Sequence, residues 1–166
     1  MKRRIILTVC MLAAAGIAGE PGAVDAKAAF SRLKSLAGEW RGADPAKGER
    51  IRYELIAGGT SLVERDSAEG RPVMVTVYHL DGNRLLMTHY CMAGNQPRMQ
   101  AREFDPATGR LRFEFLDATG LTSKDAGHMH SATFRMTDRD HMSSEWVYFE
   151  GGKPKMTEAG EYTRVR

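Results

Sequence analysis

This chain of 166 residues has few cysteines, a small net charge and few long apolar runs. There are two cysteines, Cys10 and Cys91, and Cys10 lies in an N-terminal segment that we expect to be removed. A disulfide within the mature chain is therefore excluded. The formal net charge is +3, of which Lys2, Arg3 and Arg4 supply three charges, so the mature chain is close to neutral. No basic run or basic–aromatic patch is present, which excludes nucleic acid as a partner.

The first 26 residues have the pattern of a cleaved signal peptide. Basic residues at positions 2–4 precede an apolar stretch over positions 5–18, and we expect cleavage after Ala18, Ala23 or Ala26. The apolar stretch is too short to span a bilayer and no stop-transfer pattern follows, so no transmembrane segment is expected in the mature chain. We therefore expect a signal peptide over 1–26 and a single domain over 27–166, exported to the periplasm or the extracellular space.

Most of the chain shows a two-residue alternation of apolar and polar side chains. Residues 25–36 still have helical spacing, and Gly38 supplies a stop. Beyond it, segments such as "ERIRYELIA", "RPVMVTVYHL" and "RLRFEFLD" alternate between apolar and polar residues, separated by turn signals such as Asp81-Gly82-Asn83. About ten short strands with tight turns predict a mainly β fold, an up-and-down antiparallel barrel or sandwich with a short N-terminal helix.

The stretch "THYCMAGNQPRM", residues 88–99, is predicted to be one of these hairpins. A strand runs through Met92, a turn contains Gly94 and Asn95, and a return strand starts at Arg98. The unpaired thiol of Cys91 is expected inside the barrel, because a lone cysteine behaves as a small hydrophobic residue.

The start of the domain resembles a known family. A short amphipathic helix followed by "LAGEWRG" is similar to the opening of calycin barrels, the lipocalin and fatty-acid-binding group. In that resemblance Gly38 and Trp40 match a Gly-x-Trp motif that closes one barrel end, and Arg164 or Arg166 in "EYTRVR" matches the arginine that packs over the indole. The resemblance implies a calycin-like β-barrel of about ten strands. "WRG" followed by "RYELI" is also similar to nitrobindin-like haem barrels, although the last strand contains no histidine to hold a haem.

The alternation also predicts which side chains face the barrel interior. In "RLLMTHYCM" we expect Leu85, Met87, His89 and Cys91 inside. The predicted ligand-binding residues are Tyr53, Met87, His89, Cys91, Phe113, Phe115, His130, Trp146 and Tyr148. An apolar pocket with a few polar groups is typical of a small-molecule site. We therefore expect non-catalytic binding of a small apolar or amphipathic molecule, with His89, His130 or Tyr148 holding a polar head.

Four alternatives remain open from the sequence. One is a barrel that is filled by its own side chains, or whose pocket has no physiological ligand. A haem or metal site would use His89, Cys91, His128 and His130, but no familiar ligand spacing is present. An enzyme would pair Cys91 with His89 or His130, with Asp117 or Glu145 orienting the base, but no nucleophile motif is present. A protein-binding surface would use the methionine-rich edges. The sequence assigns no catalytic residue, no metal ligand, no cofactor and no oligomeric state.

Overall fold

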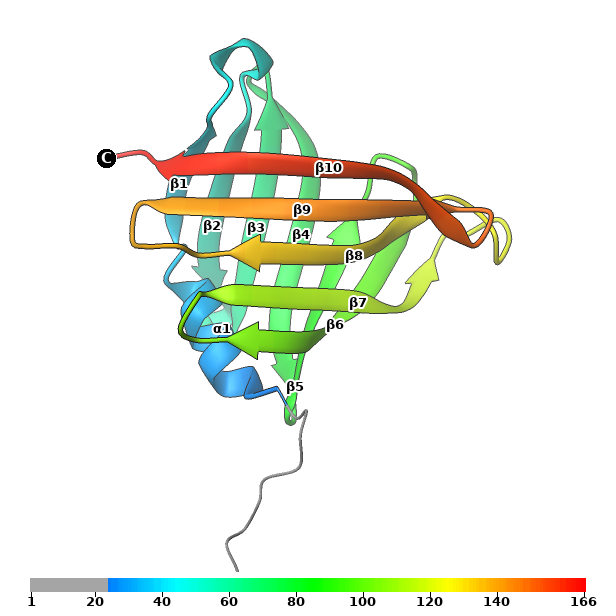
Figure 1. Cartoon of the computed structure of the whole chain (residues 1–166), viewed down its shortest axis with the longest axis horizontal. Coiled ribbons are helices and arrows are strands. Elements are labelled where there is room, and N and C mark those ends of the chain that lie inside the picture. Colours follow the sequence, from blue (N-terminus) through cyan, green and yellow to red (C-terminus); the bar gives the residue numbers. More distant parts are fainter. Residues whose placement is uncertain (1–23) are drawn as a thin grey trace, which may run out of the picture.

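Two-residue alternation continues through ten strands, and backbone hydrogen bonds join these strands into a closed barrel (Figure 1). The computed structural model describes residues 24–166; most of the predicted signal peptide, residues 1–23, lies outside the described residues. The elements are α1 Ala26–Lys34, β1 Gly38–Gly42, β2 Arg50–Ile56, β3 Ser61–Ala68, β4 Arg71–Asp81, β5 Arg84–Tyr90, β6 Gln96–Asp105, β7 Arg110–Thr119, β8 His128–Arg135, β9 His141–Glu150 and β10 Lys153–Arg164. The predicted mainly β, ten-stranded antiparallel barrel with a short N-terminal helix is confirmed.

The topology is up-and-down. Each strand pairs antiparallel with the next one along the chain, and β1 pairs with β10 to close the ring. In Figure 1, β1–β5 run upright behind β6–β10, which run across the front. None of the helices in the described part of the chain is long and apolar enough to cross a membrane.

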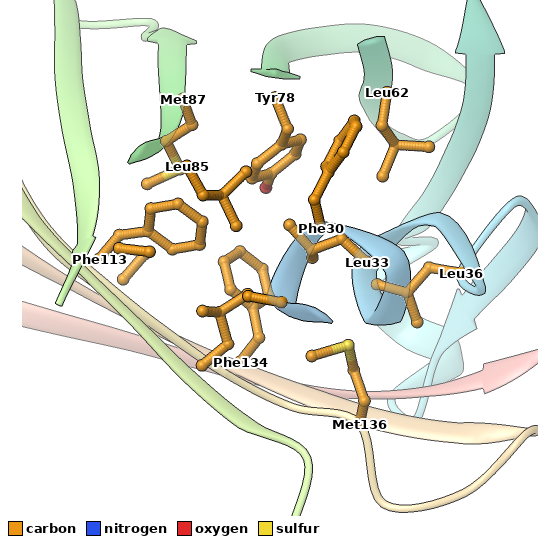
Figure 2. Close-up of a cluster of buried hydrophobic side chains, with 14 of the residues drawn as sticks. Phe30, Leu33, Leu36, Leu62, Tyr78, Leu85, Met87, Phe113, Phe134 and Met136 are labelled. Atoms are coloured by element: carbon orange, nitrogen blue, oxygen red, sulfur yellow. The ribbon is translucent and has the colours of Figure 1, made fainter. Parts of the chain in front are cut away.

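Helix α1 closes one end of the barrel. The carboxylate of Asp25 accepts a hydrogen bond from the backbone N–H of Ala28 at 2.9 Å and caps the helix N-terminus. Figure 2 shows Phe30, Leu33 and Leu36 pointing into a cluster of buried side chains from the strands. The labelled strand residues of this cluster are Leu62, Tyr78, Leu85, Met87, Phe113 and Phe134, and Met136 joins them from the position directly after β8. The apolar core therefore occupies the end of the barrel that carries the helix.

Trp40 and Arg164 make the closing contact that the sequence predicts. The Arg164 guanidinium lies 4.3 Å from the centre of the fully buried Trp40 ring, and the indole N–H donates to the Leu36 carbonyl at 2.8 Å. Arg164 also donates to the carbonyls of Ser35 and Ala37, each at 2.8 Å. One arginine thus joins the last strand to the first strand and to the segment that follows the helix.

The predicted hairpin over residues 88–99 is present with different strand ends: β5 ends at Tyr90 instead of Met92, and β6 begins at Gln96 instead of Arg98. The backbone N–H of Cys91 donates to the carbonyl of Asn95 at 3.1 Å, and that of Gly94 donates to Cys91 at 3.0 Å. On β5 the side chains of Leu85, Met87 and His89 are buried, as predicted, whereas Tyr90 is exposed.

Register shifts interrupt several strand pairings, and those around β8 bear on the predicted site. β7 and β8 pair only from Arg110–Arg135 to Glu114–Ser131, and a bulge in β8 lies between Met129 and Ser131. Such a bulge shifts the alternation by one residue, so side chains beyond it change face.

Candidate ligand-binding cavity

The inward-facing side chains change from apolar to polar along several strands. On β3 the series is Leu62, Glu64 and Asp66, and on β5 it is Leu85, Met87 and His89. The apolar members belong to the core beneath α1. The polar members therefore lie farther from the helix, toward the open part of the barrel.

A cavity of about 600 Å³ occupies that part of the barrel interior. Its apolar lining includes Ile51, Val73, Met74, Met129, Trp146 and Met156, and its polar lining includes Glu64, Asp66, His89, Ser144, Tyr148 and Tyr162. The charged side chains of Lys47 and Arg50 also line it and are exposed. This volume lies within the usual range of small-molecule sites.

A row of polar side chains crosses four neighbouring strands at the base of the cavity. The strand register places Tyr53 opposite Glu64, Glu64 opposite Thr76, and Thr76 opposite His89. All four are at most 2% exposed. The Tyr78 hydroxyl, from the adjacent core, donates a short hydrogen bond to Glu64 Oε2. The row separates the apolar core from the cavity.

Glu64 and Asp66 form a carboxyl pair on one face of β3. Burial raises the pKa of Glu64 above its usual value, and the hydroxyl of Tyr78 opposes that shift. Burial also raises the pKa of Asp66, and the nearby charge of Glu64 adds to the increase. Two such carboxyls in one site do not both ionise readily, so the pair retains a proton above the pH at which free carboxyls lose theirs.

His89 is the member of this row that contacts Trp146 on β9. Its Nδ1 is 2.9 Å from the hydroxyl of Thr76, and its ring centre is 4.7 Å from that of Trp146. Its Nε2 is buried and has no hydrogen-bond partner. Burial lowers the pKa of His89 to about 4, so the imidazole is neutral at physiological pH.

Tyr162 adds a further hydroxyl to the cavity wall. Burial raises its pKa to about 12, while a hydrogen bond with Ser144 acts in the opposite direction. Both side chains line the cavity and are uncharged at neutral pH. The site therefore combines neutral hydroxyls and a neutral imidazole with an acidic pair.

The hairpin over residues 88–99 supports one wall of the cavity. The side-chain amide of Asn95 donates to the carbonyl of Gly127 at 2.8 Å. The hydroxyl of Tyr148 packs directly against Gly127. A Cβ added to Gly127 would lie 1.8 Å from that hydroxyl oxygen. Asn95 thus fixes the loop against which a cavity-lining tyrosine packs.

Of the nine predicted ligand-binding residues, the structure brings four to the cavity and places the others elsewhere. The four that line it are His89, Cys91, Trp146 and Tyr148. Three are buried within the apolar core, namely Tyr53, Met87 and Phe113. Tyr53 remains next to the site through its position opposite Glu64.

Phe115 and His130 do not line the cavity. Their rings stack 5.2 Å apart, and His130 also stacks on Phe149 at 3.9 Å. His128 hydrogen bonds to His130 at 3.2 Å in the same cluster. These rings gather where β7 and β8 no longer pair, and the bulge beside His130 explains why simple alternation placed it inside.

The sequence prediction missed Glu64 and Asp66. The signal was present, because in "SLVERDSA" the alternation that puts Leu62 inside also puts Glu64 and Asp66 inside. Buried acidic side chains are rare, and this general expectation outweighs the local pattern when only the sequence is read.

The structure gives no support to a metal centre or a thiol–histidine pair. Within residues 24–166, no group of three or more His, Cys, Asp or Glu side chains is arranged to hold a metal ion. His89 hydrogen bonds to Thr76 through Nδ1, and His128 and His130 bond to each other, and no hydrogen bond within residues 24–166 joins Cys91 Sγ to a histidine.

Comparison with known proteins adds no assignment. No protein-family model matches the chain, and no curated protein is significantly similar to it.

Proposed function

We propose that this protein is an exported binding protein that holds a small amphipathic molecule inside a calycin-like barrel. The observation that carries the proposal is the cavity of about 600 Å³, whose walls are largely apolar and whose base is a polar row. An apolar tail would contact Met74, Met129 and Trp146, while a polar head would reach Glu64 and His89. Burial of the tail supplies the affinity, and the polar groups select the head.

The calycin assignment is supported by the closed antiparallel barrel and by Trp40 beneath Arg164 at one end. Binding is favoured over catalysis because the hydrogen bonds in the cavity fix side chains in the barrel wall. His89 is tied to Thr76, and Glu64 accepts from Tyr78. Neither arrangement presents an activated nucleophile.

Binding is tested with a neutral fluorescent probe, N-phenyl-1-naphthylamine, whose emission rises in apolar surroundings. We expect the wild-type protein to bind the probe, and Ala68→Phe and Met74→Phe, which fill the cavity, to weaken binding at least tenfold. Leu55→Phe is the matched control, because Leu55 is exposed on β2 and does not line the cavity. Equal binding by all four proteins would place the probe outside the cavity and overturn the proposal.

Export is supported by the basic and apolar segments over residues 2–18. Helix α1 begins at Ala26, which is buried, and is capped by Asp25. Removal after Ala18 or Ala23 preserves the cap, whereas removal after Ala26 would delete it. We therefore expect the intact mass of the protein recovered outside the cytoplasm to correspond to a chain that still contains Asp25; recovery of only uncleaved protein in the cytoplasm would contradict export.

A further inference from the structure

We propose that the cavity selects ligands whose polar head is a protonated amine, seated against Glu64 and Asp66. The inference rests on the proposed binding function and specifies the chemical class of the ligand. The ligand is an organic ammonium ion with an apolar alkyl or aryl tail that lies along Trp146 and Met74.

The first observation is that the carboxyl pair has no cationic partner. Among the ion pairs in residues 24–166, none involves Glu64 or Asp66. The cavity-lining cations Lys47 and Arg50 are both exposed, and Nζ of Lys47 lies 3.9 Å from Oε1 of Glu49 instead. A buried carboxylate without a counter-ion is costly, and a cation brought by the ligand would offset that cost.

The second observation is that a buried polar atom in the cavity wall lacks a partner. His89 is 2% exposed and lines the cavity, and its Nε2 is buried without a hydrogen bond. Buried polar atoms are almost always satisfied in proteins, so this nitrogen indicates a site for a polar ligand group.

An ammonium head suits these surroundings better than a neutral or anionic head. Its N–H groups would donate to the two carboxyls and to an acceptor nitrogen of a neutral His89. The nearby indole of Trp146 presents an aromatic face that also attracts cations. A carboxylate head placed at the pair would instead meet the charge of Glu64, and the cavity-lining cations Lys47 and Arg50 are exposed to solvent, where their charge is screened.

Binding of an ammonium ion would also release a proton. The empty pair retains a proton near neutral pH, and a cation placed against it favours the doubly ionised form. The ammonium ion keeps its own protons, and the proton of the pair passes to the solvent. The titratable or charged groups around the pair in the surrounding strands and cavity wall are Lys47, Glu49, Arg50, Tyr53, Tyr78, His89, Glu158 and Tyr162.

The test compares three ligands that share a ten-carbon chain: decylamine, 1-decanol and decanoate. Each is titrated into the full mature protein at pH 7 by calorimetry and by displacement of N-phenyl-1-naphthylamine. We expect decylamine to bind at least tenfold more tightly than 1-decanol, with decanoate weakest. In buffers of different ionisation enthalpy, decylamine binding should release up to one proton, and 1-decanol binding should release none.

Variants identify the groups responsible. Glu64→Gln and Asp66→Asn keep the shape of each side chain, and each should reduce the preference for decylamine at least fivefold while 1-decanol still binds. Glu54→Gln, an exposed change on β2 away from the cavity, should leave the preference intact. Circular dichroism checks that every variant is folded.

The outcomes separate the two proposals. Similar affinities for the amine and the alcohol, or tighter binding of decanoate, would overturn the amine inference and leave the binding function standing. Failure of all three ligands and of the fluorescent probe to bind would overturn both. A preference for decylamine that survives Glu64→Gln and Asp66→Asn would also overturn the inference, because the amine would then be recognised elsewhere.

Discussion

The hydroxyl of Thr76 lies 2.9 Å from Nδ1 of His89, and this contact holds the imidazole against Trp146 with Nε2 free. Thr76 is fully buried, so the contact is shielded from water. The imidazole is therefore a fixed part of the cavity wall, and its protonation is coupled to folding.

His89 should make the protein sensitive to acid. Burial lowers its pKa to about 4, so the unfolded chain takes up a proton below about pH 6.5 that the folded chain does not. The stability that the neutral imidazole contributes is fully present above pH 6.5 and is lost as the pH falls, by about 3 kcal/mol at pH 4. Urea unfolding of the His89→Gln variant should show a shallower loss between pH 6.5 and 4. The control is His79→Gln, and the same slope in both variants would contradict the assignment.

Asp66 should have the opposite dependence on pH. Its pKa is raised by burial and by Glu64, so the folded protein holds a proton that the unfolded chain releases above about pH 4. Stability is therefore lost as the pH rises through the interval between these two pKa values. The loss in the free energy of unfolding is about 1.4 kcal/mol for each unit by which the two pKa values differ, and Asp66→Asn should remove it. Chemical denaturation of the variant from pH 4 to pH 8 should show a growing gain over the wild type; a constant difference would mean that Asp66 is ionised in the folded protein.

The contact between Trp40 and Arg164 should be a major source of stability. Trp40→Ala removes a fully buried indole and should lower the free energy of unfolding by about 3–5 kcal/mol. Arg164→Lys keeps the charge but cannot reproduce the contacts to Ser35 and Ala37, so we expect a loss of about 2 kcal/mol. Thermal unfolding measures both losses. Arg166→Lys is the control, and a melting temperature of Trp40→Ala near that of the wild type would refute the role of this pair in closing the barrel.

Gly127 should matter for the cavity more than for the fold. A Cβ at this position would lie 1.8 Å from the hydroxyl of Tyr148, which lines the cavity, so Gly127→Ala must displace the ring. We expect at least a fivefold change in probe affinity with little change in melting temperature. Gly151→Ala adds the same methyl group where no atom lies within 4 Å; its left-handed backbone, with φ of +63°, makes alanine cost some stability there, but probe affinity should be unaltered. An unchanged probe affinity in Gly127→Ala would show that the position of Tyr148 does not affect binding in the cavity.

The barrel could be predicted from the sequence because its signals are local. Alternation around Met87 and His89, and turns such as Asp81-Gly82-Asn83, each depend on a few neighbouring residues. The Trp40–Arg164 contact is not local, and it was found through family resemblance.

The site was only partly predictable because it depends on exceptions to those signals. The bulge beside His130 changes which side chains face the interior, and nothing in the local composition marks its position. Glu64 follows the alternation, but its burial depends on Tyr78, which reaches it from the next strand. Such a partner is visible only once the strands are in register.

The pairing of β1 with β10 has a consequence for the order of folding. Every other strand pairing joins consecutive segments, so those hairpins can form with short loops and small losses of chain entropy. The seam at Trp40 and Arg164 must wait until both ends of the described chain meet. We expect this ring closure to form late. In pulse-labelling hydrogen exchange during refolding, the backbone amides of β1 and β10 should therefore become protected later than those of the β3–β4 hairpin.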